Sequence, residues 1–172
     1  MRIYLVGFMG AGKTRIGRAL AARRGAPFVD LDAEIEASCG QSIATLFATR
    51  GETAFRDAEH ACLRATEATD PVIVGTGGGT ITFARNRALL RRLGVTVWLN
   101  PDFDLLVTRV GDGLGRAARP LFRNVDQART LYRARLPAYR TADLRIDITT
   151  ADSPTDIVDR INDLLREPSC AT

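Results

Sequence analysis

Residues 7–14 read GFMGAGKT, and this stretch constrains the fold more than any other part of the chain. It matches the pattern G-x-x-x-x-G-K-[ST], whose glycines let the backbone curl so that successive amides face phosphate oxygens. The motif follows the apolar run 2–6 and precedes an amphipathic stretch that begins at Lys13. A helix that starts at such a loop adds the positive end of its dipole. The sequence therefore predicts a nucleotide-phosphate site between the first strand and the first helix.

The same motif assigns roles to individual residues. The ammonium group of Lys13 is expected to span the β- and γ-phosphates of ATP, and the hydroxyl of Thr14 is expected to bind Mg²⁺. Lys13 is the one lysine among the 24 basic residues. An ammonium bridges phosphate oxygens as a point charge, where a planar guanidinium fits poorly, so this placement supports the motif. The predicted nucleotide-binding residues of the loop are Gly10, Ala11, Gly12, Lys13, Thr14 and Arg15.

Length and composition restrict the class of protein. The chain has 172 residues, 45% hydrophobic and 26% charged, which is typical of one soluble globular domain spanning 1–172. No apolar run approaches the roughly 20 residues of a membrane-spanning helix, and the apolar start has no signal-peptide cleavage site. Three cysteines without metal-ligand spacing favour reduced thiols in a cytoplasmic protein. A net charge of +4 is small for a nucleic-acid-binding protein, and no recognised binding motif supports that class.

Short apolar, β-branched runs alternate with amphipathic stretches along the chain. This alternation predicts an α/β fold with a parallel sheet covered by helices on both faces. Thr82 and Ser153 are placed where helix caps belong, and Ser153-Pro154 with Asp156 is a good helix start. The predicted strands are 2–6, 27–30, 72–74, 95–99 and 144–148. The predicted helices are 13–24, 33–39, 43–50, 52–68, 83–93, 103–110, 125–135 and 154–166.

Asp30-Leu31-Asp32 ends the second predicted strand. Strand alternation would put both carboxylates on the same side, at the carboxyl edge of the sheet where open α/β folds bind ligands. One carboxylate is expected to hold Mg²⁺ through water, and the other to orient or deprotonate an acceptor hydroxyl. The alternative is that Asp32 caps the helix predicted at 33–39.

Three further features have both a functional and a structural interpretation. Gly77, Gly78 and Gly79 follow the third strand, where they permit close approach to a ligand or simply form a tight turn. Arg56 and Arg135, each taken alone, are typical of solvated surface charges. The segment 111–124 has three glycines interleaved with arginines and fits neither a helix nor a strand period. It predicts a mobile loop that bears arginines, or an ordinary surface loop.

In this order and spacing, the motifs resemble those of the shikimate kinase family from residue 2 to about residue 165. No single motif is specific, but six in register are difficult to obtain by chance. The matching features are the loop 7–14, the pair Asp30 and Asp32, the stretch 51–56, the glycines 77–79, the tripeptide 119–121, and Arg135 followed by Pro137 and Tyr139.

The resemblance implies ATP-dependent phosphorylation of shikimate to shikimate 3-phosphate, a step of aromatic amino acid biosynthesis. It implies a fold like that of nucleoside monophosphate kinases, a three-layer sandwich with a five-stranded parallel sheet, a substrate-binding region near 32–60 and a lid near 111–123. The family is usually monomeric, so a monomer is expected.

The resemblance also implies roles for residues. Asp32 would bind the acceptor hydroxyl and act as base. Arg56 and Arg135 would bind the carboxylate of shikimate. Gly78 would hold a ring hydroxyl by its amide, and its neighbours Gly77 and Gly79 would also contact the substrate. Arg119 would close over the phosphates with the lid, while Thr14 and Asp30 would serve the metal ion. Glu59, one turn beyond Arg56, is placed to hold that arginine. The predicted catalytic residues are thus Lys13, Asp32 and Arg119.

Two alternatives remain open at this stage: a kinase of another small hydroxylated acid such as gluconate, or a nucleotide-binding relative without catalysis. The combination of Asp32, Arg56 and Arg135 favours shikimate over gluconate. The chain departs from the family pattern at Arg15, where many relatives carry a second hydroxyl. It also lacks a basic residue in 149–152, which family members often offer to adenine. Both departures concern nucleotide affinity.

Overall fold

A computed structural model describes residues 1–110 and 124–166. Five parallel strands form one sheet in the order β2-β3-β1-β4-β5. The α/β fold with a five-stranded parallel sheet is thereby confirmed. The strands are β1 (Arg2–Val6), β2 (Phe28–Asp30), β3 (Val72–Gly75), β4 (Val95–Pro101) and β5 (Leu144–Ile148).

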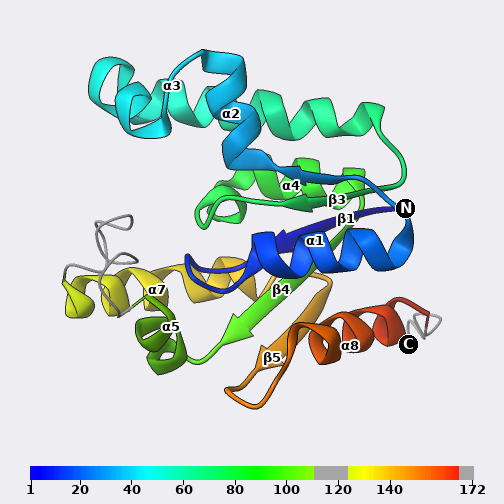
Figure 1. Cartoon of the computed structure of the whole chain (residues 1–172). Helices are drawn as coiled ribbons and strands as arrows, with labels where there is room; N and C mark the ends of the chain where they lie inside the picture. Colours follow the sequence, from blue (N-terminus) through cyan, green and yellow to red (C-terminus); the bar gives the residue numbers. More distant parts are fainter. Residues whose placement is uncertain (111–123, 167–172) are drawn as a thin grey trace.

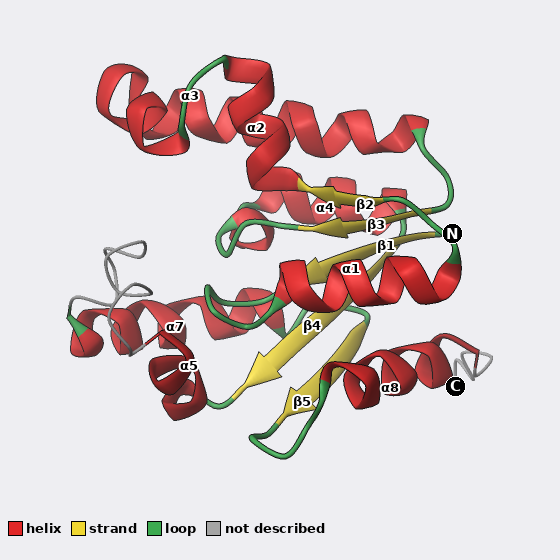
Figure 2. Ribbon diagram, in the orientation of Figure 1, coloured by secondary structure: helices red, strands yellow, loops and turns green. Residues whose placement is uncertain are grey.

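Helices cover both faces of this sheet, as Figures 1 and 2 show. α1 and α8 pack against each other in front of the sheet, and α4 lies behind it (Figure 1). α2 and α3 pack together beyond the β2 edge. The helices are α1 (Lys13–Arg24), α2 (Leu31–Cys39), α3 (Ile43–Ala65), α4 (Ala84–Leu93), α5 (Phe103–Val110), α7 (Val125–Tyr139) and α8 (Pro154–Arg166), with short 3-10 turns at η1 (Thr66–Ala68) and η2 (Thr80–Thr82).

The central strands are apolar because both of their faces are buried. Every residue from Ile3 to Val6 in β1 is inaccessible to solvent, and Val72 to Val74 in β3 are equally buried. In the register of the sheet, Gly75 of β3 pairs with Leu5 of β1 on one side and with Asp30 of β2 on the other. The carboxyl ends of β1, β2 and β3 therefore lie at the same level, and the loops that follow them meet at one edge of the sheet.

Some element ends differ from the prediction for local reasons. α2 begins at Leu31, two residues early, because the Asp30 side chain caps it by accepting a hydrogen bond from the Asp32 amide at 3.2 Å. The expected cap at Thr82 is wrong, since Thr82 ends η2 and its hydroxyl donates to the Gly79 carbonyl at 2.6 Å. The Ser153 cap is confirmed: its hydroxyl accepts from the Asp156 amide at 3.2 Å.

α7 runs four residues beyond its predicted end at 135, through Pro137 to Tyr139. α3 joins the two predicted helices 43–50 and 52–68 across a kink at Gly51, and it ends at Ala65, where the 3-10 turn η1 begins. In the described part of the chain, no helix is both long and apolar enough to cross a membrane. Cys39 and Cys62 carry free thiols, in agreement with the expected reduced state, and Cys170 lies outside the described residues.

Candidate functional site

The glycine-rich loop joins β1 to α1 and has the shape that the sequence predicts. Gly7 has a φ of 144°, and a Cβ there would lie 2.6 Å from the Leu99 carbonyl oxygen, so only glycine fits between the loop and β4. Gly12, with a φ of 97°, precedes the first residue of α1. Lys13 Nζ donates to the carbonyl oxygens of Gly7 and Phe8 at 2.8 and 3.0 Å, which places its charge over the loop.

An open cavity of 410 Å³ lies at this edge of the sheet. It brings together the phosphate loop, both predicted carboxylates and one glycine of the turn after β3. Four of its lining residues, Met9, Gly75, Thr76 and Arg109, were not among the predicted site residues. The first three lie within or beside the glycine-rich motifs, whereas no local pattern indicates Arg109. The lining residues are Met9, Gly10, Gly12, Lys13, Thr14, Arg15, Asp30, Asp32, Gly75, Thr76, Gly78 and Arg109.

Thr14 and Asp30 provide a pair of hard oxygen ligands at the base of the cavity. The Thr14 hydroxyl donates to Asp30 Oδ2 at 2.9 Å, which joins the start of α1 to the end of β2. In the described residues no three His, Cys, Asp or Glu side chains group together as a metal cage. Mg²⁺ does not need one, because it binds through one or two protein oxygens together with water and substrate phosphates. The pair therefore fits a magnesium ion bound to ATP.

Asp32 lies in the first turn of α2 and not in a strand, so the expected strand alternation of Asp30 and Asp32 is wrong. The helix cap is Asp30, and the alternative that Asp32 caps the helix is wrong as well. Both carboxylates nevertheless line the cavity. Burial by the cavity walls raises the pKa of Asp32, Lys13 opposes this effect, and Asp30 and Glu59 add to it by charge repulsion.

Arg56 projects from α3 and is held on several sides. Its Nη1 donates to Glu59 Oε2 at 3.0 Å, as predicted from their spacing, and its Nη2 donates to Glu52 Oε1 at 3.1 Å. The guanidinium lies over the rings of Phe55 and Phe83, 4.8 and 4.4 Å from their centroids. Glu59 is fully buried, so this arginine has a fixed place and is not a free surface charge.

Arg56 and Arg135 converge on the glycine turn from opposite sides. A Cβ placed on Gly79 would lie 3.3 Å from both terminal nitrogens of Arg56 and 3.5 Å from Nη2 of Arg135. A Cβ on Gly77 would lie 3.0 Å from Asp32 Oδ1. Both arginines and the carboxylate thus surround the same three glycines, which supports the ligand-contact interpretation of the turn. Arg56 keeps its pairing with Glu52 and Glu59 there, and Arg135 brings a second guanidinium to the same turn.

Gly78 brings the glycine turn and Arg135 close to the phosphate loop. A Cβ on Gly78 would lie 3.3 Å from the Met9 amide nitrogen and 3.5 Å from Nη1 of Arg135. The Gly78 carbonyl accepts a hydrogen bond from the Tyr139 hydroxyl at 2.6 Å. Sequence analysis noted Tyr139 only as part of a motif, because its partner is 61 residues away along the chain.

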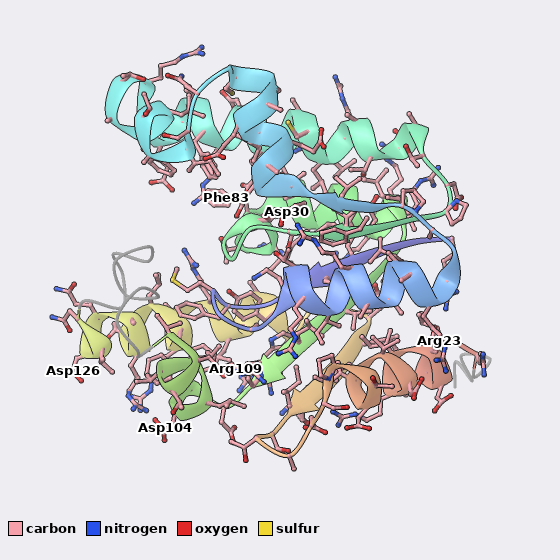
Figure 3. All side chains as sticks on the ribbon, in the orientation of Figure 1. Arg23, Asp30, Phe83, Asp104, Arg109 and Asp126 are labelled. Carbon is pink, nitrogen blue, oxygen red and sulfur yellow. The ribbon has the colours of Figure 1, made fainter. Side chains whose placement is uncertain are left out.

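A second cavity of 170 Å³ adjoins the phosphate loop on its other side. Its lining includes Arg15 and Arg109, which also line the first cavity, together with Asp152 and Pro154 from the segment before α8. Figure 3 shows Asp30 and Arg109 on opposite sides of the loop. Arg109 lies in the last turn of α5 and donates to the Ala11 carbonyl at 3.4 Å. It brings a guanidinium to the place where 149–152 offers no basic side chain.

Arg119 and the predicted lid 111–123 lie outside the described residues. His60, which the sequence did not connect with the site, has its Nδ1 2.8 Å from Asn86 Oδ1. Asn86 in turn donates to Glu59 Oε2 at 3.3 Å. His60 therefore supports the buried carboxylate from behind and does not face the cavity.

Comparisons with known proteins agree with this geometry. Residues 9–166 match the family model described as "Shikimate kinase". The chain is 42% identical to a shikimate kinase of Symbiobacterium thermophilum over 97% of each chain. It also resembles two solved structures. One is a shikimate kinase from Acinetobacter baumannii in complex with shikimate, with a TM-score of 0.86 and 36% identity, covering 95% of this chain and 92% of the other. The other is a shikimate kinase from Bacteroides thetaiotaomicron, with a TM-score of 0.87 and 33% identity over 96% and 98%.

A gluconokinase from Sinorhizobium meliloti 1021 shares the fold alone, at 18% identity and a TM-score of 0.59 over 95% of this chain and 94% of that one. The family-model match and the identities over nearly whole chains decide between the alternatives that the sequence left open. The fold, the phosphate loop and the turn with its two arginines are those of a small-molecule kinase. The chain belongs to the shikimate kinase family and is an enzyme that phosphorylates shikimate with ATP.

Proposed function

We propose that the 410 Å³ cavity holds shikimate and the phosphates of ATP side by side, and that the enzyme forms shikimate 3-phosphate. The observation that carries this assignment is the convergence of Arg56 and Arg135 on Gly79 next to the phosphate loop. Two guanidinium groups at one point form a site for a planar carboxylate, because each pairs with it through charged hydrogen bonds that fix its orientation.

The nucleotide side of the site rests on the loop 7–14. Lys13 would neutralise the β- and γ-phosphates, and Thr14 and Asp30 would hold the magnesium ion. Magnesium, when bound, supplies positive charge to the β- and γ-phosphate oxygens. Because the second cavity starts at Gly10 and Gly12, the nucleoside part of ATP extends into it between Arg109 and Pro154. Arg109 then supplies the positive charge near the nucleoside that no residue of 149–152 provides.

The acceptor side uses Asp32 as the base. Its carboxylate contacts the turn at Gly77 and shares the cavity with Lys13, so an acceptor hydroxyl held there lies between the base and the phosphates. Asp32 accepts the hydroxyl proton as the oxygen attacks the γ-phosphorus, and Gly78 holds a ring hydroxyl. We expect the enzyme to act as a cytoplasmic monomer.

The assignment is tested by equilibrium binding of shikimate and of MgATP to separate samples of Arg135→Ala. Loss of a charged hydrogen-bonded pair costs about 1.5–3 kcal/mol, which corresponds to a rise in the Kd of shikimate of roughly 10- to 150-fold. The Kd of ATP should stay within about twofold of the wild-type value, since the thermodynamic loss is confined to the acceptor site.

Arg129→Ala is the matched control. Arg129 lies on the same helix, pairs with the exposed Asp104 at 2.9 Å, and lines neither of the two cavities assigned to the substrates. It should leave the Kd of shikimate unchanged. Equal shikimate affinity in wild type and Arg135→Ala would refute the carboxylate clamp.

A further inference from the structure

The hydroxyl of Tyr139 takes no part in the proposed chemistry, yet it is held firmly at the site. Tyr139 is fully buried at the end of α7, and its hydroxyl donates to the Gly78 carbonyl at 2.6 Å. Its ring stacks on Trp98 of β4, with centroids 5.8 Å apart and planes 24° apart. Trp98 in the sheet therefore holds the Tyr139 ring in place, and the Tyr139 hydroxyl in turn holds the Gly78 carbonyl.

Fixing one carbonyl orients a whole peptide group. The peptide unit is planar, so the direction of the Gly78 carbonyl sets the direction of the Gly79 amide. Among the described residues the cis peptide bond is Asp70-Pro71, so the bond from Gly78 to Gly79 is trans and the Gly79 amide points away from Tyr139. Glycines have little conformational preference of their own, so a run of three needs an outside contact to hold one conformation.

The turn is anchored from its other side as well. The Thr80 hydroxyl donates to Glu59 Oε1 at 2.7 Å, and the other oxygen of Glu59 accepts from Arg56. α3 and α7 thus each supply one arginine and, about one turn later, one residue that is hydrogen-bonded to the glycine turn or to Thr80 directly after it. On α3 the pair is Arg56 with Glu59, and on α7 it is Arg135 with Tyr139. The two anchors set the separation of the two arginines.

We propose that Tyr139 is a positioning residue for the acceptor carboxylate: its hydroxyl holds Gly78 so that the turn and Arg135 keep the geometry that shikimate needs. This inference rests on the proposed function of the clamp. Burial raises the pKa of Tyr139 to about 12, so the hydroxyl keeps its proton and remains a donor throughout the neutral pH range. A phenylalanine would keep the ring stack and remove the contacts of the hydroxyl with the Gly78 carbonyl and with Arg135.

The test compares Tyr139→Phe with Tyr4→Phe. Tyr4 is also fully buried, but its hydroxyl pairs with Thr66 Oγ1 at 2.8 Å and not with the glycine turn. Both variants lose a buried, hydrogen-bonded hydroxyl, so both should melt at slightly lower temperature. Only Tyr139→Phe should raise the Kd and KM of shikimate, by about five- to tenfold for the lost hydroxyl contacts. Its kcat at saturating shikimate and its KM for ATP should stay within about twofold.

Trp98 is the single tryptophan of the chain, so its fluorescence reports directly on the stacked ring. Wild-type emission from Tyr139→Phe would verify that the ring has kept its place. Unchanged shikimate affinity in that variant would overturn the proposal, and so would an equal loss of affinity in both variants, because that would be a general effect of stability. A wild-type protein that bound no shikimate would instead refute the proposed function on which the inference depends.

Discussion

Asp32 is the residue whose chemistry depends most on its surroundings. Its side chain reaches solvent, but the cavity walls raise its pKa, and Asp30 repels it. A base must be deprotonated to act, so activity should fall as pH drops through this raised pKa. For stability the sign is the opposite: the folded state holds the proton more tightly than the unfolded chain. That contribution favours folding at low pH and is lost as pH rises through the raised pKa.

Asp32→Asn should therefore separate activity from stability. Without the base, kcat should fall by about 10²- to 10⁴-fold. At neutral pH the melting temperature should be equal to that of the wild type or higher, because the neutral amide removes the charge that burial and Asp30 disfavour. Initial rates and calorimetry at pH 7 check both statements. A destabilised variant with normal kcat would contradict the assigned role.

Lys13→Met tests the phosphate side of the site. The ammonium lies over the loop through two carbonyl contacts, in reach of the phosphates that the loop would bind. Removing one preorganised charge from a transferring phosphoryl group should lower kcat by at least about 10²- to 10³-fold. Arg23→Met is the control, because Arg23 is an exposed residue of the same helix that pairs with Asp159. Its turnover should match the wild type, and a Lys13→Met enzyme with wild-type turnover would exclude the lysine from catalysis.

Local motifs in the sequence predicted several residues that line the cavity, but not the residues that hold them in place. Lys13, Thr14 and Asp32 are predictable because they belong to local motifs next to strand ends. Arg109 and Tyr139 are not, because their partners are 98 and 61 residues away in the chain. A single sequence holds no information on such pairings until the order of the strands is known.

α3 is the element that carries Arg56 to the glycine turn. Its two halves meet at Gly51, whose φ of 76° and ψ of 176° lie in a region that only glycine occupies readily. The kink redirects the helix just before Phe55 and Arg56, and it allows the first half to pack Phe47 against Phe55, with ring centroids 4.6 Å apart. A straight helix would carry these groups to other positions.

Gly51→Ala should disturb this element in a specific way. The strained backbone should cost about 1–3 kcal/mol of unfolding free energy, and the KM of shikimate should rise because Arg56 moves with the kink. Gly40→Ala is the control: Gly40 ends α2 in the ordinary left-handed conformation, with a φ of 65°, where alanine costs about 1 kcal/mol. Denaturant unfolding and steady-state kinetics measure the two effects. A shikimate KM that rose equally in both variants would exclude a special role for the kink.

Most helices and strands could be predicted from the spacing of their apolar residues and from the capping residues and glycines at their ends. The strands 2–6 and 144–148 and the helices 13–24, 103–110 and 154–166 have the predicted bounds. The errors arise where tertiary contacts override local preference. α7 continues past 135 because Tyr139 is drawn into the core against Trp98, and α2 starts early because Asp30 caps it. Sequence alone shows neither contact.

The fold brings the glycine-rich loop 7–14 and the turn 77–79 with its two arginines together at one edge of the sheet. The carboxyl ends of β1, β2 and β3 supply the loop, Asp30 and the glycine turn, and α3 and α7 reach over that turn from two sides. The strand order followed from no local signal, but the alternation of elements predicted the layers and the edge. The residues assigned to the two substrates therefore meet, although they are spread from Gly7 to Arg135.

ADP release with MgATP measures whether this site transfers phosphate from ATP to shikimate. The coupled assay compares shikimate, gluconate, nucleoside monophosphates and no acceptor. Release that depends on shikimate and is absent with the other acceptors is the predicted result. Release with another acceptor, or none with shikimate, would contradict the account.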